Sequence, residues 1–109
     1  MKNTPNRRAS DRKILAGGVI IKINQKDYIL NDISREGIGV LVDDTLTFHI
    51  GQRIASLYLE NHQKAKPLIG IVNHMTRNES GTICGIRFDF RNGSELGYVQ
   101  KFREALQVG

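Results

Sequence analysis

The sequence predicts a single domain dominated by β-structure: a small barrel or sandwich of six antiparallel strands with one helix at the C-terminal end. Six short apolar segments rich in β-branched residues follow one another at hairpin spacing between Gly17 and Phe90. Apolar residues recur at helical spacing only after Asn92. A chain of 109 residues has the size of one domain, and curling the sheet removes edge strands that would invite aggregation.

The elements follow from the pattern in order. Residues 1–13 are polar and lack a period, which predicts a flexible N-terminal arm, with the folded domain at 14–109. We expect a turn at Gln25-Lys26-Asp27 between the first two strands, and a hairpin turn at Asn78-Glu79-Ser80-Gly81 before the last strand. The six predicted strands lie near residues 19–23, 28–33, 37–42, 54–60, 68–72 and 83–90.

The final segment predicts a helix over about residues 93–107. Asn92-Gly93-Ser94 offers an N-cap, which we place at Ser94. The apolar residues expected to face the sheet are Leu96, Val99, Phe102 and Leu106.

The composition favours an anionic partner in a reducing compartment. A net charge of +5 and a pI near 9.7 suit a nucleotide, a nucleic acid or a lipid headgroup. The single cysteine, Cys84, excludes an internal disulfide and cannot alone build a zinc site. No apolar run approaches the ~20 residues that span a bilayer, and the first residues lack a secretory pattern, so we expect a cytoplasmic protein.

Basic residues cluster in the predicted arm, at Arg7, Arg8, Arg12 and Lys13. A guanidinium is planar, permanently charged and shaped to bind phosphate oxygens in a bidentate manner, and it can stack on a purine. Two arginines four positions apart in a flexible arm could therefore hold one compact dianion from two sides. A solvated basic arm without a ligand explains the same residues when they are taken alone.

The second pattern is Asp32-Ile33-Ser34-Arg35-Glu36-Gly37 at the end of a predicted strand. Asp32 and Ser34 are two positions apart, so a strand would project both from one face. The carboxylate could accept the two donors on the Watson–Crick edge of guanine, with the hydroxyl beside it. Gly37 permits a positive φ or a close approach of the backbone to a ligand. A turn that needs small polar residues is the alternative explanation, and neither pattern is expected to lie in the core.

Together the two patterns resemble the RxxxR and DxSxxG motifs of PilZ domains, receptors for the bacterial messenger cyclic di-GMP. Three later segments, Gly37–Val40, Gly70–Val72 and Gly85–Phe88, are similar to strands of the same family. The resemblance covers Arg7 to about Leu106. It implies a six-stranded antiparallel β-barrel with a C-terminal α-helix, in agreement with the strand count from the pattern.

The resemblance also implies roles for individual residues. Arg8 and Arg12 would bind phosphates and stack on guanine. Asp32 and Ser34 would bind a guanine edge, and Gly37 would let the ligand approach.

Two further positions follow from the same resemblance. Arg7 precedes the first motif, a position that accompanies two stacked ligand molecules per chain. His74 occupies a ligand-flanking position where many relatives carry a larger or cationic residue.

The predicted function is thus a non-catalytic receptor. It would bind cyclic di-GMP without any other cofactor or metal, and relay the signal to a partner protein as the arm becomes ordered. A basic barrel that binds RNA or single-stranded DNA fits the charge but lacks a cluster of exposed aromatic residues, so nucleic acid is the disfavoured partner. A PilZ-like adaptor without ligand binding is the third possibility.

We expect no catalytic or metal site. The histidines at 49, 62 and 74 are far apart in sequence and have no cysteine or paired carboxylate beside them. Cys84 lies in an apolar strand and is expected in the core. No phosphate-binding loop or nucleophile–base pattern is present, so the sequence does not favour an enzyme.

Overall fold

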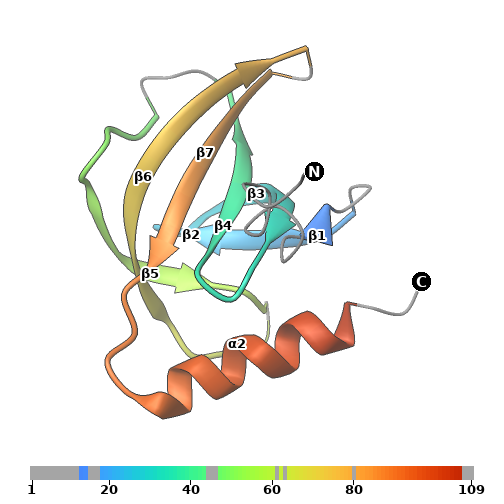
Figure 1. The fold of residues 1–109 in the computed structure, drawn as a ribbon, viewed down its shortest axis with the longest axis vertical. Coiled ribbons are helices and arrows are strands. Elements are labelled where there is room, and N and C mark those ends of the chain that lie inside the picture. Colours follow the sequence, from blue (N-terminus) through green and yellow to red (C-terminus); the bar gives the residue numbers. More distant parts are fainter. Residues whose placement is uncertain are drawn as a thin grey trace, which may run out of the picture.

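The computed structural model describes residues 13–14, 18–43, 47–60, 62, 64–79 and 81–106. Within these residues, six strands close an antiparallel barrel in the order β3, β2, β5, β6, β7, β4, and β4 pairs back onto β3 (Figure 1). A further strand of two residues, β1, pairs with the end of β3. The strands are β1 (Lys13–Ile14), β2 (Ile20–Ile23), β3 (Lys26–Ile33), β4 (Gly37–Val42), β5 (Arg53–Tyr58), β6 (Leu68–Asn78) and β7 (Gly81–Phe88).

The predicted barrel and helix are therefore confirmed, and one turn differs in position. β6 begins at Leu68, as predicted, and continues to Asn78 because it pairs with β7 along the whole hairpin. The β2–β3 turn lies at Asn24 and Gln25, with φ of 51° and 72°, rather than at Gln25–Asp27. Two consecutive positive φ values match the twist of a two-residue hairpin, so Lys26 and Asp27 belong to β3.

The core fills the inside of the barrel with aliphatic side chains from every barrel strand. The side chains that are least exposed come mainly from isoleucine, leucine and valine, which suit a pleated surface. They are Ile21, Ile23, Leu30, Ile33, Ile38, Val40, Ile54, Leu57, Leu68, Val72 and Ile86. Cys84 is fully buried among them, as expected, and burial raises the pKa of its thiol to about 11.

Helix α2 (Gly93–Ala105) crosses one end of the barrel (Figure 1). Its N-cap is Asn92, whose Oδ1 accepts a hydrogen bond from the Glu95 N–H at 3.1 Å, so the prediction of Ser94 as cap is wrong. Asn92 has the extended backbone that an N-cap requires. Val99 is completely buried against the core.

The other apolar residues of the helix are less buried in the core than the periodicity predicted. Phe102 and Leu106 are partly buried against the core, and Tyr98 joins them. Leu96 is 39% exposed, so it does not face the sheet as expected. Tyr98 Oη instead fixes the helix to the barrel, because it donates a hydrogen bond of 2.6 Å to Glu60 after β5.

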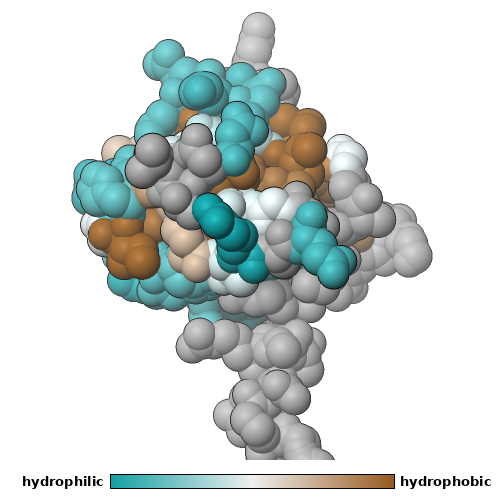
Figure 2. All heavy atoms as spheres, turned by 90° about the horizontal axis from the view of Figure 1, so that it is seen from above, coloured by the Kyte–Doolittle hydropathy of each residue, from teal (hydrophilic) through white to brown (hydrophobic). Residues whose placement is uncertain are grey.

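The opposite end of the barrel is seen in Figure 2, where strongly hydrophilic residues lie beside smaller apolar areas. In the part of the chain that the structure describes, no helix has the length and apolar character to span a bilayer.

Candidate ligand-binding site

Four residues from four strands form one row across the outside of the barrel. Asp32 of β3 pairs with Gly39 of β4, Gly39 pairs with Gly85 of β7, and Gly85 pairs with His74 of β6. Residues paired in an antiparallel sheet project to the same side. The side chains of the neighbours along these strands, such as Ile38 and Ile86, fill the core, so the row faces outward.

A β-bulge brings each end of this row into place. Asn31 and Asp32 together oppose Gly39, between the regular pairs on either side. In the same way, Asn73 and His74 together oppose Gly85. A bulge of this kind bends the strand and re-aims a side chain. The two bulges flank the two glycines symmetrically.

The glycines are required because the flanking side chains occupy the space above them. A Cβ on Gly39 would overlap the carboxylate of Asp32, and a Cβ on Gly85 would overlap the imidazole of His74. The carboxylate and the imidazole therefore cover the backbone of these two paired glycines. Asp32 and His74 come from the two ends of the row, three strand spacings apart along the sheet.

The predicted site residue Gly37 is buried, and glycine is needed there because a neighbouring strand lies close to it. A Cβ at this position would overlap the carbonyl oxygen of Ile86 on β7. Gly37 is not among the residues with positive φ. The structure thus shows a close approach between two strands of the barrel at Gly37, and the approach of a ligand to this residue stays a prediction. Gly37 pairs with Arg87, one step along the sheet from Gly39 and Gly85.

Ser34 closes the turn between β3 and β4. Its Oγ accepts hydrogen bonds from the N–H groups of Glu36 at 3.2 Å and Gly37 at 3.3 Å. The backbone N–H of Ser34 donates to the carbonyl of Gly37 at 2.9 Å. The hydroxyl therefore shapes the loop that holds Arg35 and Glu36. Ser34 is 2% exposed and Asp32 is 6% exposed, so the expectation that the motif lies apart from buried structure is wrong.

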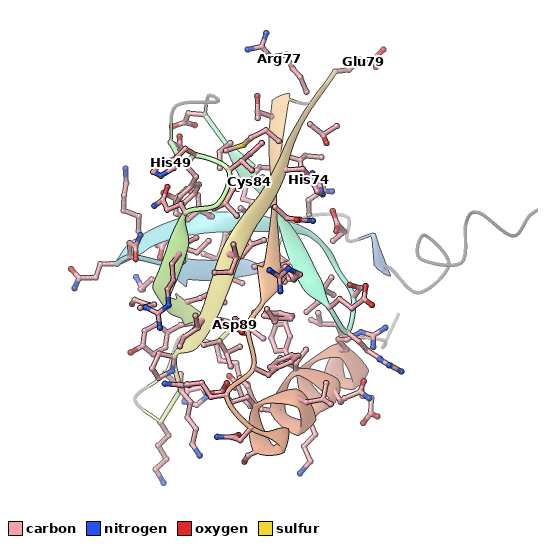
Figure 3. The ribbon with its side chains drawn as sticks, turned by 60° about the vertical axis from the view of Figure 1, so that its left-hand side comes forward. His49, His74, Arg77, Glu79, Cys84 and Asp89 are labelled. Atoms are coloured by element: carbon pink, nitrogen blue, oxygen red, sulfur yellow. The ribbon has the colours of Figure 1, made fainter. Side chains whose placement is uncertain are left out.

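A groove with a volume of about 370 Å³ runs beside this row. The turn after β3 forms one wall, β6 forms the other, β7 forms the floor, and the start of α2 closes one end. The lining residues are Arg35–Ile38, Asn73–His74, Gly85–Phe88, Phe90 and Leu96. Asp32 and Gly39 continue the floor just beyond its edge. Figure 3 shows His74 alongside the β6–β7 hairpin, below Arg77 and Glu79 at the hairpin tip.

The groove combines positive charge with small apolar surfaces. Arg35 and Arg87 are exposed and form no hydrogen bond or ion pair with the rest of the described chain. His74 Nδ1 lies 3.4 Å from Thr76 Oγ1, which orients the ring along β6. Phe90 and Leu96 add apolar rims at the helix end. This arrangement suits an anion that carries a planar ring system.

The predicted arginines Arg7, Arg8 and Arg12 lie outside the described residues. The structure does show where their segment joins the barrel. Lys13 pairs with Ile33, and Ile14 pairs with Asp32. β1 thus pairs with the end of β3 that precedes Ser34.

A second concave surface lies between the β5–β6 connection and the first turns of α2. It has a volume of about 420 Å³, and Lys64, Lys66 and Tyr98 are among its residues. Its acidic residues already have partners. Arg91 holds the Glu95 carboxylate and lowers its pKa. Glu60 accepts the hydrogen bond of Tyr98, and burial, followed by this hydrogen bond, raises the pKa of the phenol.

The histidines and the cysteine behave as the sequence predicted. His49, His62 and His74 are all exposed, and Cys84 is enclosed in the core. Among the described residues, no group of three metal-binding side chains is close enough to hold an ion.

The structure thus joins Ser34 and Gly37 in one turn, with Gly37 on the lining of the groove and Asp32 beside it, paired with Gly39. The sequence analysis did not identify Arg87 as a groove residue. It also did not explain why glycine is needed at positions 39 and 85. Glycines in the middle of two β-branched strands were the available signal, since glycine in a strand often marks a close approach. Their partners Asp32 and His74 depend on two bulges, which no local pattern in the sequence indicates.

No protein-family model and no curated protein matches the sequence. Two solved structures are similar in fold. One is Escherichia coli YcgR in complex with c-di-GMP, with a TM-score of 0.65 and 15% identity over 88% of this chain and 44% of that chain. The other is the Bacillus subtilis inhibitor of motility MotI/DgrA, with a TM-score of 0.61 and 14% identity over 90% of this chain and 51% of that chain. The chain spans about half the length of each, and the likeness shows a PilZ-like barrel fold.

Proposed function

We propose that this chain is a non-catalytic receptor that binds cyclic di-GMP in the groove beside Asp32. The observation that carries the proposal is the place of the second sequence motif beside the groove. Gly37 lines the groove, Ser34 accepts a hydrogen bond from the Gly37 N–H, and Asp32 pairs with Gly39 on the same strand as Gly37. Arg8 and Arg12 lie outside the described residues, and their part in binding is proposed from their motif.

The chemistry of the groove matches the parts of the ligand. The Asp32 carboxylate accepts the N–H donors on the Watson–Crick edge of guanine. A flat base would lie against the Asp32 carboxylate and the His74 imidazole, which cover Gly39 and Gly85. Arg8 and Arg12 supply the planar cations that bind phosphates and stack on purines. Arg7 would stack on a guanine of a second ligand molecule.

The relay would depend on the arm. Ligand contacts that exist only when residues 1–12 dock over the groove would shift the population toward the docked state. The surface formed by the docked arm and the groove would then meet a partner protein. This mechanism needs no covalent chemistry, which agrees with a receptor rather than an enzyme.

The fold likeness supports the same ligand. YcgR has been solved in complex with c-di-GMP, and its similar region covers 88% of this chain. At 15% identity the likeness concerns the fold, so the ligand rests on the motifs and the groove.

Calorimetric titration of the purified chain with cyclic di-GMP tests the proposal, with GTP and a short single-stranded RNA as controls. We expect saturable binding to cyclic di-GMP alone, with one or two ligands per chain at the inflection. Binding of RNA alone, with an affinity that falls steeply as salt is added, would assign the basic barrel to nucleic acid instead. If none of the three titrations produces heat, the remaining interpretation is a PilZ-like adaptor that binds no ligand.

A further inference from the structure

Arg87 is an arginine of the groove that neither sequence motif contains. It lies on β7, where it pairs with Gly37 of β4 and with Ile71 of β6. Residues two apart on a strand share a face, so Arg87 projects outward on the same side as Gly85. Glycine is therefore its neighbour both across to β4 and along β7, and neither neighbour has a side chain that could block the guanidinium.

The charge of Arg87 is not neutralised by the described chain. It is exposed and makes no hydrogen bond or ion pair there. The other arginine of the β6–β7 hairpin, Arg77, is equally exposed and unpaired, but it lies at the hairpin tip, away from His74 and the groove (Figure 3). The two residues differ in location rather than in exposure or pairing, which makes Arg77 a matched control.

Two exposed arginines of the described chain line the groove. Arg35 lies in the turn between β3 and β4, and Arg87 stands on β7, with β4 between it and β3. A molecule in the groove would thus meet both guanidinium groups.

We propose that Arg87 is a further phosphate-binding residue of this site. The proposal rests on the proposed function, because a cyclic dinucleotide has two phosphates on opposite sides of its ring. The arm binds one phosphate, and the guanidinium of Arg87 binds the other with its paired N–H donors. Arg87 therefore makes the site selective for a ligand with two phosphates over a mononucleotide, in addition to the contacts of the two motifs.

The test compares Arg87→Gln with Arg77→Gln in calorimetric titrations with cyclic di-GMP at two salt concentrations. Both substitutions remove one exposed positive charge and keep a polar side chain of similar length. We expect Arg87→Gln to weaken binding about 10-fold or more, the effect of one charge-assisted contact. Its affinity should also depend less on salt than that of the parent, and Arg77→Gln should match the parent in both respects.

Three outcomes are distinguishable. If the parent binds and Arg87→Gln binds equally well, Arg87 is not a ligand contact, and the receptor function stands. If Arg77→Gln weakens binding as much as Arg87→Gln, the effect comes from net charge, and the proposal is overturned. If the parent itself does not bind, the receptor function fails and this inference fails with it. Thermal unfolding serves as the control: both variants should unfold at the same temperature as the parent, which would show that the fold is kept.

Discussion

The carboxylate of Asp32 and the imidazole of His74 lie over two glycines that face each other across neighbouring strands. Asp32 covers Gly39, and His74 covers Gly85. This relationship links the local sequence to the proposed site, because each side chain reaches its place through a bulge and finds room only above a glycine. We place a base of the ligand against these two side chains.

The first prediction concerns the carboxylate itself. Asp32→Ala should weaken cyclic di-GMP binding about 10-fold to 100-fold, since it removes charge-assisted hydrogen bonds to guanine worth ~1.5–3 kcal/mol. The loss is measured by calorimetry. Asp27→Ala is the control, because Asp27 is exposed on the same strand and its ion pair with Lys22 at 2.9 Å lies away from the groove. Equal affinity for both variants and the parent would remove Asp32 from the site.

The second prediction tests the glycine under that carboxylate. Gly39→Ala should displace the buried Asp32 carboxylate, so it should lower the free energy of unfolding by ~1–3 kcal/mol and also weaken ligand binding. Chemical denaturation and calorimetry measure the two effects. Gly97→Ala is the matched control in α2, where an added Cβ meets nothing within 4 Å. There alanine should raise stability by ~0.5–1 kcal/mol, because glycine is unfavourable inside a helix.

Parental stability and affinity for Gly39→Ala would contradict the second prediction. A loss of binding in Gly97→Ala would also contradict it, since an added Cβ at this helix position meets nothing within 4 Å.

The third prediction concerns the arginines of the arm. Arg8→Ala or Arg12→Ala should each weaken cyclic di-GMP binding about 10-fold to 100-fold, by loss of a phosphate contact. Arg7→Leu should instead change the number of ligands per chain from two toward one, which the inflection of the titration reports. An unchanged ratio would count against a second stacked ligand, and unchanged affinity in the first two variants would exclude the arm from the site.

The fourth prediction uses the buried thiol. The pKa of Cys84 is raised to about 11 by burial, so the thiol of the folded protein stays protonated at pH 8. A disulfide reagent should therefore modify the native protein at least ~100-fold more slowly than the chain unfolded in guanidinium, since the thiolate is the reactive form. Fast modification of the native protein would show that the core around Cys84 opens readily.

The same shift has a consequence for stability. The unfolded chain loses its thiol proton at a lower pH than the folded chain, so it binds fewer protons between about pH 9 and pH 11. Ionisation of this group therefore lowers the free energy of unfolding as the pH rises through that range. Cys84→Ala should reduce the decline.

Much of the fold could be predicted because its signals are local. β-branched runs separated by turn residues located the barrel strands, and the spacing of Val99 and Phe102 located the helix. The errors lie where a neighbouring residue decides the geometry. Asn92 rather than Ser94 caps the helix because its side chain reaches the Glu95 N–H, and Leu96 is left at the rim of the groove.

The candidate site was predictable only in part, because residues far apart in the sequence decide its geometry. The spacing of Asp32, Ser34 and Gly37 in the chain indicated one end of it. Arg87 belongs to the groove through pairing with Gly37, which is 50 positions earlier in the sequence. The structural roles of Ser34 and Gly37, in the turn and in the contact between β4 and β7, are added to the role in binding that their motif predicts.

The central claim is that cyclic di-GMP binds in the groove beside Asp32. Backbone amide spectra of the isotope-labelled chain, recorded by NMR during a titration with cyclic di-GMP, test it most directly. The account predicts that the largest shifts occur at Gly37, Gly39 and Gly85, with little change at Lys64 and Tyr98 on the second concave surface. Shifts confined to Lys64 and Tyr98, or no shifts at saturating ligand, would contradict it.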